Sequence, residues 1–184
     1  MTITKTPIEG LLILTPRVFG DNRGHFFESY NAAFFNNATG YKVDFVQDNQ
    51  SYSTKGVLRG LHLQKGEFSQ AKLVRVTKGK VLDVAVDLRT GSSTYAQYYS
   101  VLLTEENNVQ FFIPRGFAHG FIVLSDEAIF QYKCDNYYNK EAESGIHYAD
   151  PELNINWQID NLDVIVSDKD MELPFLKNAP DFGF

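Results

Sequence analysis

The chain has 184 residues, 43% of them apolar and 14% aromatic, which is enough for a single domain with a real core, taken here as residues 1–184. Its 22% charged residues argue against disorder, and its net charge of −6 argues against nucleic acid or an anionic membrane as a partner. The one cysteine, Cys134, has no partner for an intramolecular disulfide, and neither a signal peptide nor a membrane-length apolar run is present, so we expect a cytoplasmic protein.

The first third of the chain predicts a strand, a turn and a short helix. The strand is expected at 11–14, where Pro16 ends it. Residues 21–24 have the composition of a turn, and the aromatic residues that follow either face a ligand or complete an ordinary hairpin. A helix is expected over 31–37, with Asn31 as its N-cap and Gly40 as its stop.

The middle of the chain predicts many short strands. They are expected at 43–50, 55–58, 72–77, 81–88, 95–103, 109–113, 119–124 and 128–134. The short glycine-containing turn at 78–80 predicts that the strands on either side of it form a hairpin. Many short strands at this spacing indicate a β-sandwich or a β-barrel.

The segment 59–72 contains an arginine, a histidine and a lysine within a short span. Strand alternation from Gly60 would direct Gly60, His62 and Gln64 to one face and the two intervening leucines to the other. Such a strand lines a polar cavity in a small β-barrel, although a surface strand with a satisfied histidine would have the same pattern.

The last third of the chain is less regular. Residues 137–146 are polar, Asp150-Pro151 begins a turn, and 155–157 predict a short β-like piece. Ser167 is expected to cap a short helix at 167–170. No repeat or linker divides the chain.

Two histidines are the only good candidates for a metal site. Gly-x-His-x around His62 and Pro-x-Gly-x-x-His ending at His119 are similar to motifs of the cupin superfamily, whose metal-binding members usually have His-x-His in the first motif. Here the second position is Gln64, and a neutral amide is a poor ligand for a transition metal. We therefore expect no metal and no cofactor.

Covalent catalysis and nucleotide-binding loops have little support. Cys134 lies in an apolar strand-like run, as buried inert thiols do, and no Gly-x-Ser-x-Gly or glycine-rich phosphate motif occurs.

Acid–base chemistry has better support in the sequence. His62 can accept a proton near neutral pH, Tyr132 can donate one from across a cavity, and Lys72 can hold an oxyanion. These groups suit proton abstraction next to a carbonyl, one option among several on chemistry alone.

Longer motifs run through nearly the whole chain. They are 21–28, 47–49, 59–64, 70–76, 79–89, 114–121, 132–134, 150–151, 155–157 and 167–170. In this order they closely resemble the dTDP-4-dehydrorhamnose 3,5-epimerases, a cupin-type family. The resemblance implies a mainly β fold, a cupin-type jelly-roll β-barrel with a few short helices. It also implies a homodimer whose N-terminal strands are exchanged between subunits.

The resemblance also implies roles for individual residues. His62 would be the general base, oriented by Asp170, with Tyr132 as the general acid and Lys72 beside the enolate oxygen. The remaining implied residues would contact the nucleotide-sugar substrate: Arg23, Phe26, Glu28, Gln47, Asp48, Asn49, Arg59, His119, Tyr138, Glu143 and Lys169. For each contact residue the alternative is a structural hydrogen bond.

The implied reaction is cofactor-independent epimerisation of dTDP-4-dehydro-6-deoxy-D-glucose at C3 and C5, in dTDP-L-rhamnose biosynthesis. The chain departs from the family pattern at 65–69 and 139–140, where prolines are usual, and at 147–148, where a tryptophan is usual. These departures leave open whether both centres are inverted, and the alternative is an epimerase that acts at C3 or C5 alone on a related nucleotide 4-ketosugar. A non-enzymatic sugar-binding cupin would be expected to lack His62 or Tyr132, and both are present.

Overall fold

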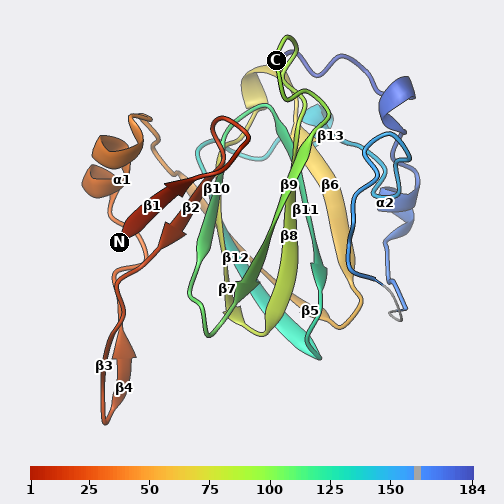
Figure 1. The fold of residues 1–184 in the computed structure, drawn as a ribbon. Helices are drawn as coiled ribbons and strands as arrows, with labels where there is room; N and C mark the ends of the chain where they lie inside the picture. Colours follow the sequence, from red (N-terminus) through yellow and green to blue (C-terminus); the bar gives the residue numbers. More distant parts are fainter. Residues whose placement is uncertain (160–162) are drawn as a thin grey trace.

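The computed structural model describes residues 1–159 and 163–184. Most of the regular structure is strand (Figure 1). The strands are β1 (Thr2–Lys5), β2 (Leu12–Thr15), β3 (Phe19–Asp21), β4 (Gly24–Phe26), β5 (Gln47–Thr54), β6 (Leu58–Gln64), β7 (Lys72–Lys78), β8 (Lys80–Asp87), β9 (Tyr98–Thr104), β10 (Gln110–Ile113), β11 (Phe117–Val123), β12 (Glu127–Cys134) and β13 (Glu143–Gly145).

The helices are short. They are α1 (Ala32–Thr39) and α2 (Asp168–Met171), with single 3₁₀ turns at η1 (Gly66–Phe68), η2 (Lys140–Ala142) and η3 (Leu176–Asn178). Both predicted helix starts are confirmed, because Asn31 Oδ1 accepts from the Phe34 amide at 3.0 Å and Ser167 Oγ accepts from the Asp170 amide at 3.2 Å. No helix among the described residues is long and apolar enough to span a membrane.

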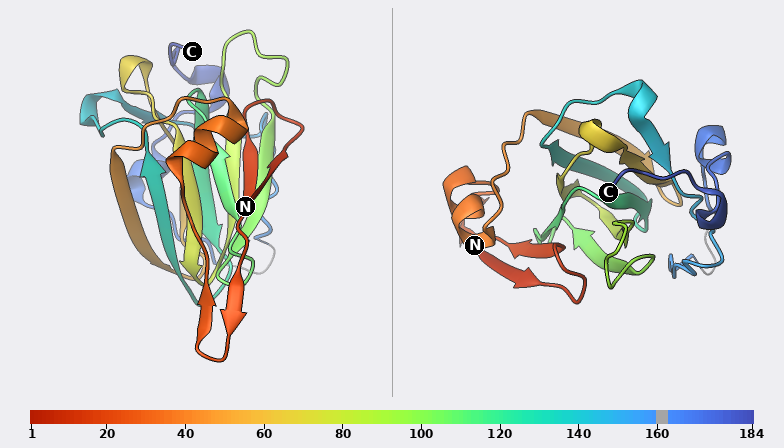
Figure 2. Two further views of the ribbon diagram at one scale, coloured as in Figure 1. Left: turned by 90° about the vertical axis from the view of Figure 1, so that its left-hand side faces the viewer. Right: turned by 90° about the horizontal axis from the view of Figure 1, so that it is seen from above.

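Two antiparallel sheets face each other as a jelly roll, which confirms the expected fold (Figures 1 and 2). One sheet has six strands in the order β1-β2-β10-β7-β12-β5, and the other has five in the order β13-β6-β11-β8-β9. β3 and β4 form a separate hairpin that projects beyond the end of the two sheets (Figures 1 and 2).

Strand alternation divides the apolar residues among three cores. The first lies between the sheets and includes Val76, Ala85 and Phe130. A second core covers the outer face of the five-stranded sheet, where Leu82, Val84 and Val86 of β8 meet Trp157 and other residues of the C-terminal segment. The third packs α1 against the outer face of the six-stranded sheet. Since both outer faces are partly covered, the central strands β8, β10 and β11 are buried along almost their whole length.

The predicted hairpin around 78–80 is wrong. β7 pairs with β10 and β12, whereas β8 pairs with β11 and β9, so the chain passes from one sheet to the other at Gly79. Gly79 has a φ of +81°, and a Cβ there would collide with the backbone oxygen of Glu127. A short glycine-containing turn can connect strands of two different sheets as well as the two strands of a hairpin. Strand alternation alone does not distinguish the two connections.

Several predicted strand boundaries also need correction. β5 begins at Gln47, because Val43 packs into the α1 core and its amide donates to Asn36 Oδ1 at 3.1 Å. Residues 55–56 form a turn, and β6 begins at Leu58. Residues 155–157 form no strand, and β1 was not expected.

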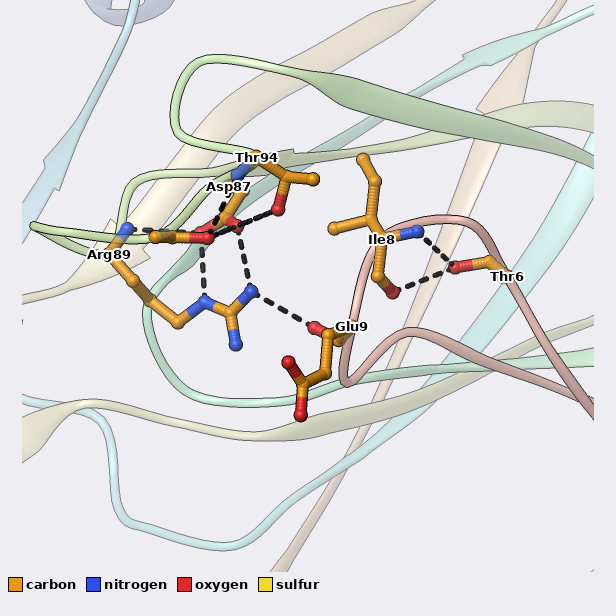
Figure 3. Close-up of polar contacts among 7 residues, drawn as sticks. Thr6, Ile8, Glu9, Asp87, Arg89 and Thr94 are labelled. Atoms are coloured by element: carbon orange, nitrogen blue, oxygen red, sulfur yellow. Dashed lines mark hydrogen bonds and ion pairs between the residues drawn. The ribbon is translucent and has the colours of Figure 1, made fainter.

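Asp87, at the end of β8, anchors the N-terminal loop (Figure 3). Its carboxylate accepts from Arg89 Nε at 2.8 Å and from the Thr94 hydroxyl at 2.7 Å, and the same guanidinium donates to the backbone oxygen of Glu9 at 2.9 Å. Burial raises the pKa of Asp87, but the hydrogen bonds from Arg89, Ser92 and Thr94 outweigh it and lower the pKa to about 2.

Candidate active site

His62 of β6 and Asp170 of α2 form a close pair. His62 Nε2 lies 2.7 Å from Asp170 Oδ1, and Asp170 Oδ2 accepts from the Gly60 amide at 3.1 Å. Burial raises the pKa of Asp170, but these hydrogen bonds and the nearby imidazole bring it below its usual value. The carboxylate is therefore an anion at neutral pH and can fix the orientation of the imidazole.

A bulge in β6 brings Arg59 to the same side of the sheet as His62. The pairing with β11 matches His62 with His119 but Arg59 with Phe121, so the register shifts between them. Gly60 sits at the shift with a φ of +128°, and a Cβ there would lie only 2.6 Å from Gly120 Cα. The expected simple alternation is therefore interrupted, although the leucines of β6 do pack into the outer core.

Lys72 and Tyr132 approach from the six-stranded sheet. They lie on the neighbouring strands β7 and β12, with Lys72 Nζ 6.0 Å from the centre of the Tyr132 ring. Burial lowers the pKa of Lys72 and raises that of Tyr132. The phenol therefore keeps its proton at neutral pH.

A second histidine–aspartate pair lies deeper between the sheets. His119 Nε2 is 2.9 Å from Asp83 Oδ2, and both side chains are buried. Burial lowers the pKa of His119 and raises that of Asp83. The sequence interpretation missed Asp83, although an acidic residue in the otherwise apolar part of β8 was a usable signal.

These groups surround one cavity of about 560 Å³ between the sheets. A neighbouring compartment of about 300 Å³ shares His62, Lys72 and Tyr132 with it. The predicted contact residues that line the two compartments are Gln47, Asn49, Arg59, His119, Tyr138, Glu143 and Lys169.

The mouth of the cavity carries a small polar network. Tyr138 Oη donates to Glu143 at 2.7 Å, and Lys169 Nζ lies 2.6 Å from the same carboxylate. Gln47 Nε2 donates to Asn49 Oδ1 at 3.0 Å. The Tyr138 amide donates to Gln47 Oε1 at 3.3 Å, so the contacts join the start of β5, the loop after β12 and the helix that carries Asp170.

Four predicted contact residues lie away from the cavity of their own chain. Asp48 faces the opposite side of β5, where Lys133 Nζ lies 2.9 Å from its carboxylate. Arg23 and Phe26 belong to the projecting hairpin, and Arg23 pairs with Asp21 (Figure 1). Glu28 follows the hairpin and accepts from Asn31 Nδ2 at 3.2 Å.

The described residues contain no group of three or more His, Cys, Asp or Glu side chains placed to hold a metal ion. In each histidine–aspartate pair Nε2 is already directed at a carboxylate. Cys134 is buried, and burial raises the pKa of its thiol to about 11. The side chains that face the cavity therefore offer acid, base and cationic groups.

Comparison with known proteins identifies close relatives. The family model described as dTDP-4-dehydrorhamnose 3,5-epimerase matches residues 5–178. The dTDP-4-dehydrorhamnose 3,5-epimerase of Escherichia coli strain K12 is 53% identical over 173 residues, which cover 94% of this chain and 93% of that protein.

Solved structures agree in sequence and in fold. The crystal structure of dTDP-4-dehydrorhamnose 3,5-epimerase from Elizabethkingia anophelis NUHP1 is 52% identical, has a TM-score of 0.93 and overlaps over 97% of each chain. That of dTDP-6-deoxy-D-glucose-3,5-epimerase from Legionella pneumophila Philadelphia 1, in complex with dTDP-4-keto-L-rhamnose, is 49% identical with a TM-score of 0.94. It covers 97% of this chain and 94% of that one.

Proposed function

Because this chain belongs to the dTDP-4-dehydrorhamnose 3,5-epimerase family, we propose a role for each cavity residue in that reaction. The enzyme inverts C3 and C5 of dTDP-4-dehydro-6-deoxy-D-glucose and yields dTDP-4-dehydro-L-rhamnose. Both carbons adjoin the C4 ketone, so removal of either proton gives an enolate. Inversion then requires that a proton return from the opposite face of the sugar.

The observation that carries the proposal is that base and acid come from facing sheets. His62 stands on the five-stranded sheet and Tyr132 on the six-stranded sheet, and both line the same cavity. A sugar held between them would expose one face to each group. His62 removes the proton, and Tyr132 supplies one from the other side.

The local electrostatics suit these roles. Asp170 is an anion at neutral pH, so it stabilises the imidazolium that forms when His62 takes the proton. Lys72 extends from the strand beside Tyr132 and compensates the negative charge that develops on the enolate oxygen. Its partly desolvated ammonium is more effective there than it would be in water.

Substrate contacts divide between the chain and a second subunit. Arg59, Gln47 and Asn49 line the compartments around the catalytic residues and would hold the nucleotide diphosphate and nearby groups, with the residues at the mouth adding contacts. Arg23, Phe26 and Glu28 can serve only if the projecting hairpin reaches another chain, so we propose a homodimer in which they complete the partner's site. Unpaired sheet edges near the N-terminal strands favour such an exchange.

Mixing two inactive variants tests the shared site. Arg23→Ala and His62→Ala subunits, combined and allowed to exchange, should regain activity because some dimers contain one intact cavity. Light scattering at micromolar concentration supplies the control. A monomer, or no recovery in a mixture shown to exchange, would contradict the shared site.

We also propose that residues 1–184 act as one domain and that the enzyme works without a cofactor in the cytoplasm. Strands β2, β7 and β10 contribute to both the inner core and the α1 core, which supports one folding unit. A single buried cysteine is consistent with a reducing compartment.

Tyr132→Phe tests the two-face mechanism. The base and Lys72 remain, so a proton can still leave and return to the same face through His62. Deuterium exchange at one carbon should therefore be retained when inversion is lost. NMR of the sugar in deuterated water measures both. Equal loss of exchange and inversion in a folded variant would show that Tyr132 is not a dedicated acid. In the wild type, deuterium at both C3 and C5 identifies the double epimerase, and deuterium at one carbon identifies the restricted relative.

A further inference from the structure

Ser51 lies on β5 among polar residues that point into the cavity. Gln47, Asn49, Ser51 and Ser53 share the inward face of this strand. Asn49 Nδ2 approaches Cys134 Sγ at 3.7 Å, and Ser53 Oγ accepts from Arg59 Nε at 3.1 Å. Within residues 1–159 and 163–184, Ser51 Oγ is the one buried side-chain polar atom without a hydrogen-bond partner.

An unbonded buried hydroxyl destabilises the protein that carries it. The residue paired with Ser51 across the sheet is Phe130, which offers no polar atom. Ser51 is nevertheless one of the residues that line the 560 Å³ cavity. Its missing partner can therefore come from a bound ligand.

The neighbours of Ser51 indicate which part of the ligand it meets. The inward-facing residue before Ser51 on β5 is Asn49, which pairs with Tyr132. The inward-facing residue after it is Ser53, which accepts a hydrogen bond from Arg59. Inward steps on a strand are roughly 7 Å apart. Ser51 thus lies between the proposed acid and an arginine, where the sugar of a nucleotide sugar joins its diphosphate.

Arg59 favours the phosphate end of that junction. Its Nε is held by Ser53, which leaves the two Nη groups for a ligand, and no carboxylate of the described residues lies within ion-pair distance of it. A guanidinium fork oriented in this way matches the oxygens of a phosphate. A serine hydroxyl beside the guanidinium adds a neutral hydrogen-bond donor for the same phosphate.

We propose that Ser51 is a substrate-binding residue whose hydroxyl donates a hydrogen bond to the diphosphate, in one subsite with Arg59. The assignment rests on the proposed function, because that function supplies a nucleotide-sugar diphosphate as the ligand. A sugar oxygen is the other acceptor of the same chemistry, and the test separates the two.

The test uses Ser51→Ala in the full-length protein, with dTDP and the complete nucleotide sugar as separate probes. Titration calorimetry should give a Kd for dTDP roughly 10-fold to 100-fold higher than in the wild type, as expected for a lost bond to a charged group. The KM for the sugar nucleotide should rise by a similar factor, with kcat within about twofold of the wild type.

The matched control is Thr54→Ala, which removes an exposed hydroxyl from the same strand. It should leave the dTDP Kd and the KM unchanged. Chemical unfolding provides a second check, because Ser51→Ala removes an unpaired hydroxyl and should leave stability unchanged or raise it. A clear loss of stability would show an internal partner and overturn the proposal.

The remaining outcomes are also decisive. An unchanged dTDP Kd with a higher KM or a lower kcat would assign the contact to the sugar and overturn the diphosphate subsite. If the wild-type protein binds dTDP but does not epimerise the ketosugar, the proposed function fails. A weakened dTDP Kd in Ser51→Ala would still support the subsite in that case.

Discussion

The two histidines that line the cavity from the five-stranded sheet each pair with an aspartate, and the two pairs differ in access to solvent. The His62 side chain is 31% exposed and its aspartate comes from the short helix α2. The His119 side chain is 8% exposed, and its partner Asp83 is fully buried on the adjacent strand. The same two residue types therefore stand in two different environments, although the two histidines are paired across the neighbouring strands β6 and β11.

The difference teaches that surroundings, rather than residue type, decide which pair can transfer protons. Hydrogen bonds from His62 and Gly60 hold Asp170 as an anion, and the His62 side chain keeps an exposed side where it lines the cavity. Around His119 and Asp83, burial favours the uncharged form of both partners. That pair is suited to fix the cavity wall and present a ring edge to the ligand.

The largest expected effect is on the reaction rate, through the more exposed pair of His62 and Asp170. His62→Ala should lower both epimerisation and solvent exchange by about 10²-fold to 10⁴-fold, the usual contribution of a general base. NMR in deuterated water measures both. His147→Ala, which alters a histidine stacked on Tyr148 outside the cavity, is the control and should keep normal rates. Retained exchange in His62→Ala would assign the base elsewhere.

Removing a partner from the buried pair of His119 and Asp83 should instead lower the stability of the protein. Asp83→Ala leaves the buried imidazole of His119 without its hydrogen-bond partner and should lower the free energy of unfolding by about 1–3 kcal/mol. Urea unfolding measures this loss. Asp170→Ala is the matched variant, and we expect a smaller loss of stability with a larger loss of kcat. The reverse ranking would remove the distinction between the two pairs.

Asp87 adds a carboxylate whose partner is always charged. Its folded pKa of about 2 lies below the unfolded value of about 3.9, so its contribution is complete above about pH 5 and is lost as pH falls toward 2. This shift corresponds to about 2–3 kcal/mol. The stability difference between wild type and Asp87→Asn should shrink over that range, and a constant difference would mean that the Arg89 contact does not lower the pKa.

The smallest expected effect is none. The proposed mechanism needs only a base (His62), an acid (Tyr132) and a cation (Lys72). The chelator EDTA should therefore leave the epimerisation rate unchanged. The assay follows product formation after dialysis against the chelator. A large loss that added metal restores would contradict the metal-independent mechanism.

Much of the local structure could be predicted from the sequence. Asn31, Gly40 and Ser167 act as caps because capping depends on a few neighbouring residues. Family motifs named the catalytic candidates, and His62, Lys72, Tyr132 and Asp170 do meet around one cavity. Asp83 was missed although its place in an apolar run was a signal, because its partner His119 lies on another strand. Ser51 was missed because its interest depends on a buried hydroxyl without a partner, which no local pattern records.

The sequence by itself determined the residue types, the alternation of the strands and the family, since each is written in neighbouring residues or in long motifs. The tertiary structure decided that β7 and β8 belong to different sheets, that a bulge turns Arg59 toward His62, and that the hairpin carrying Arg23 leaves its own cavity. These outcomes depend on contacts between residues far apart in the chain. A strand shows the same alternation whichever partner it pairs with, so only the assembled sheets select the pairing.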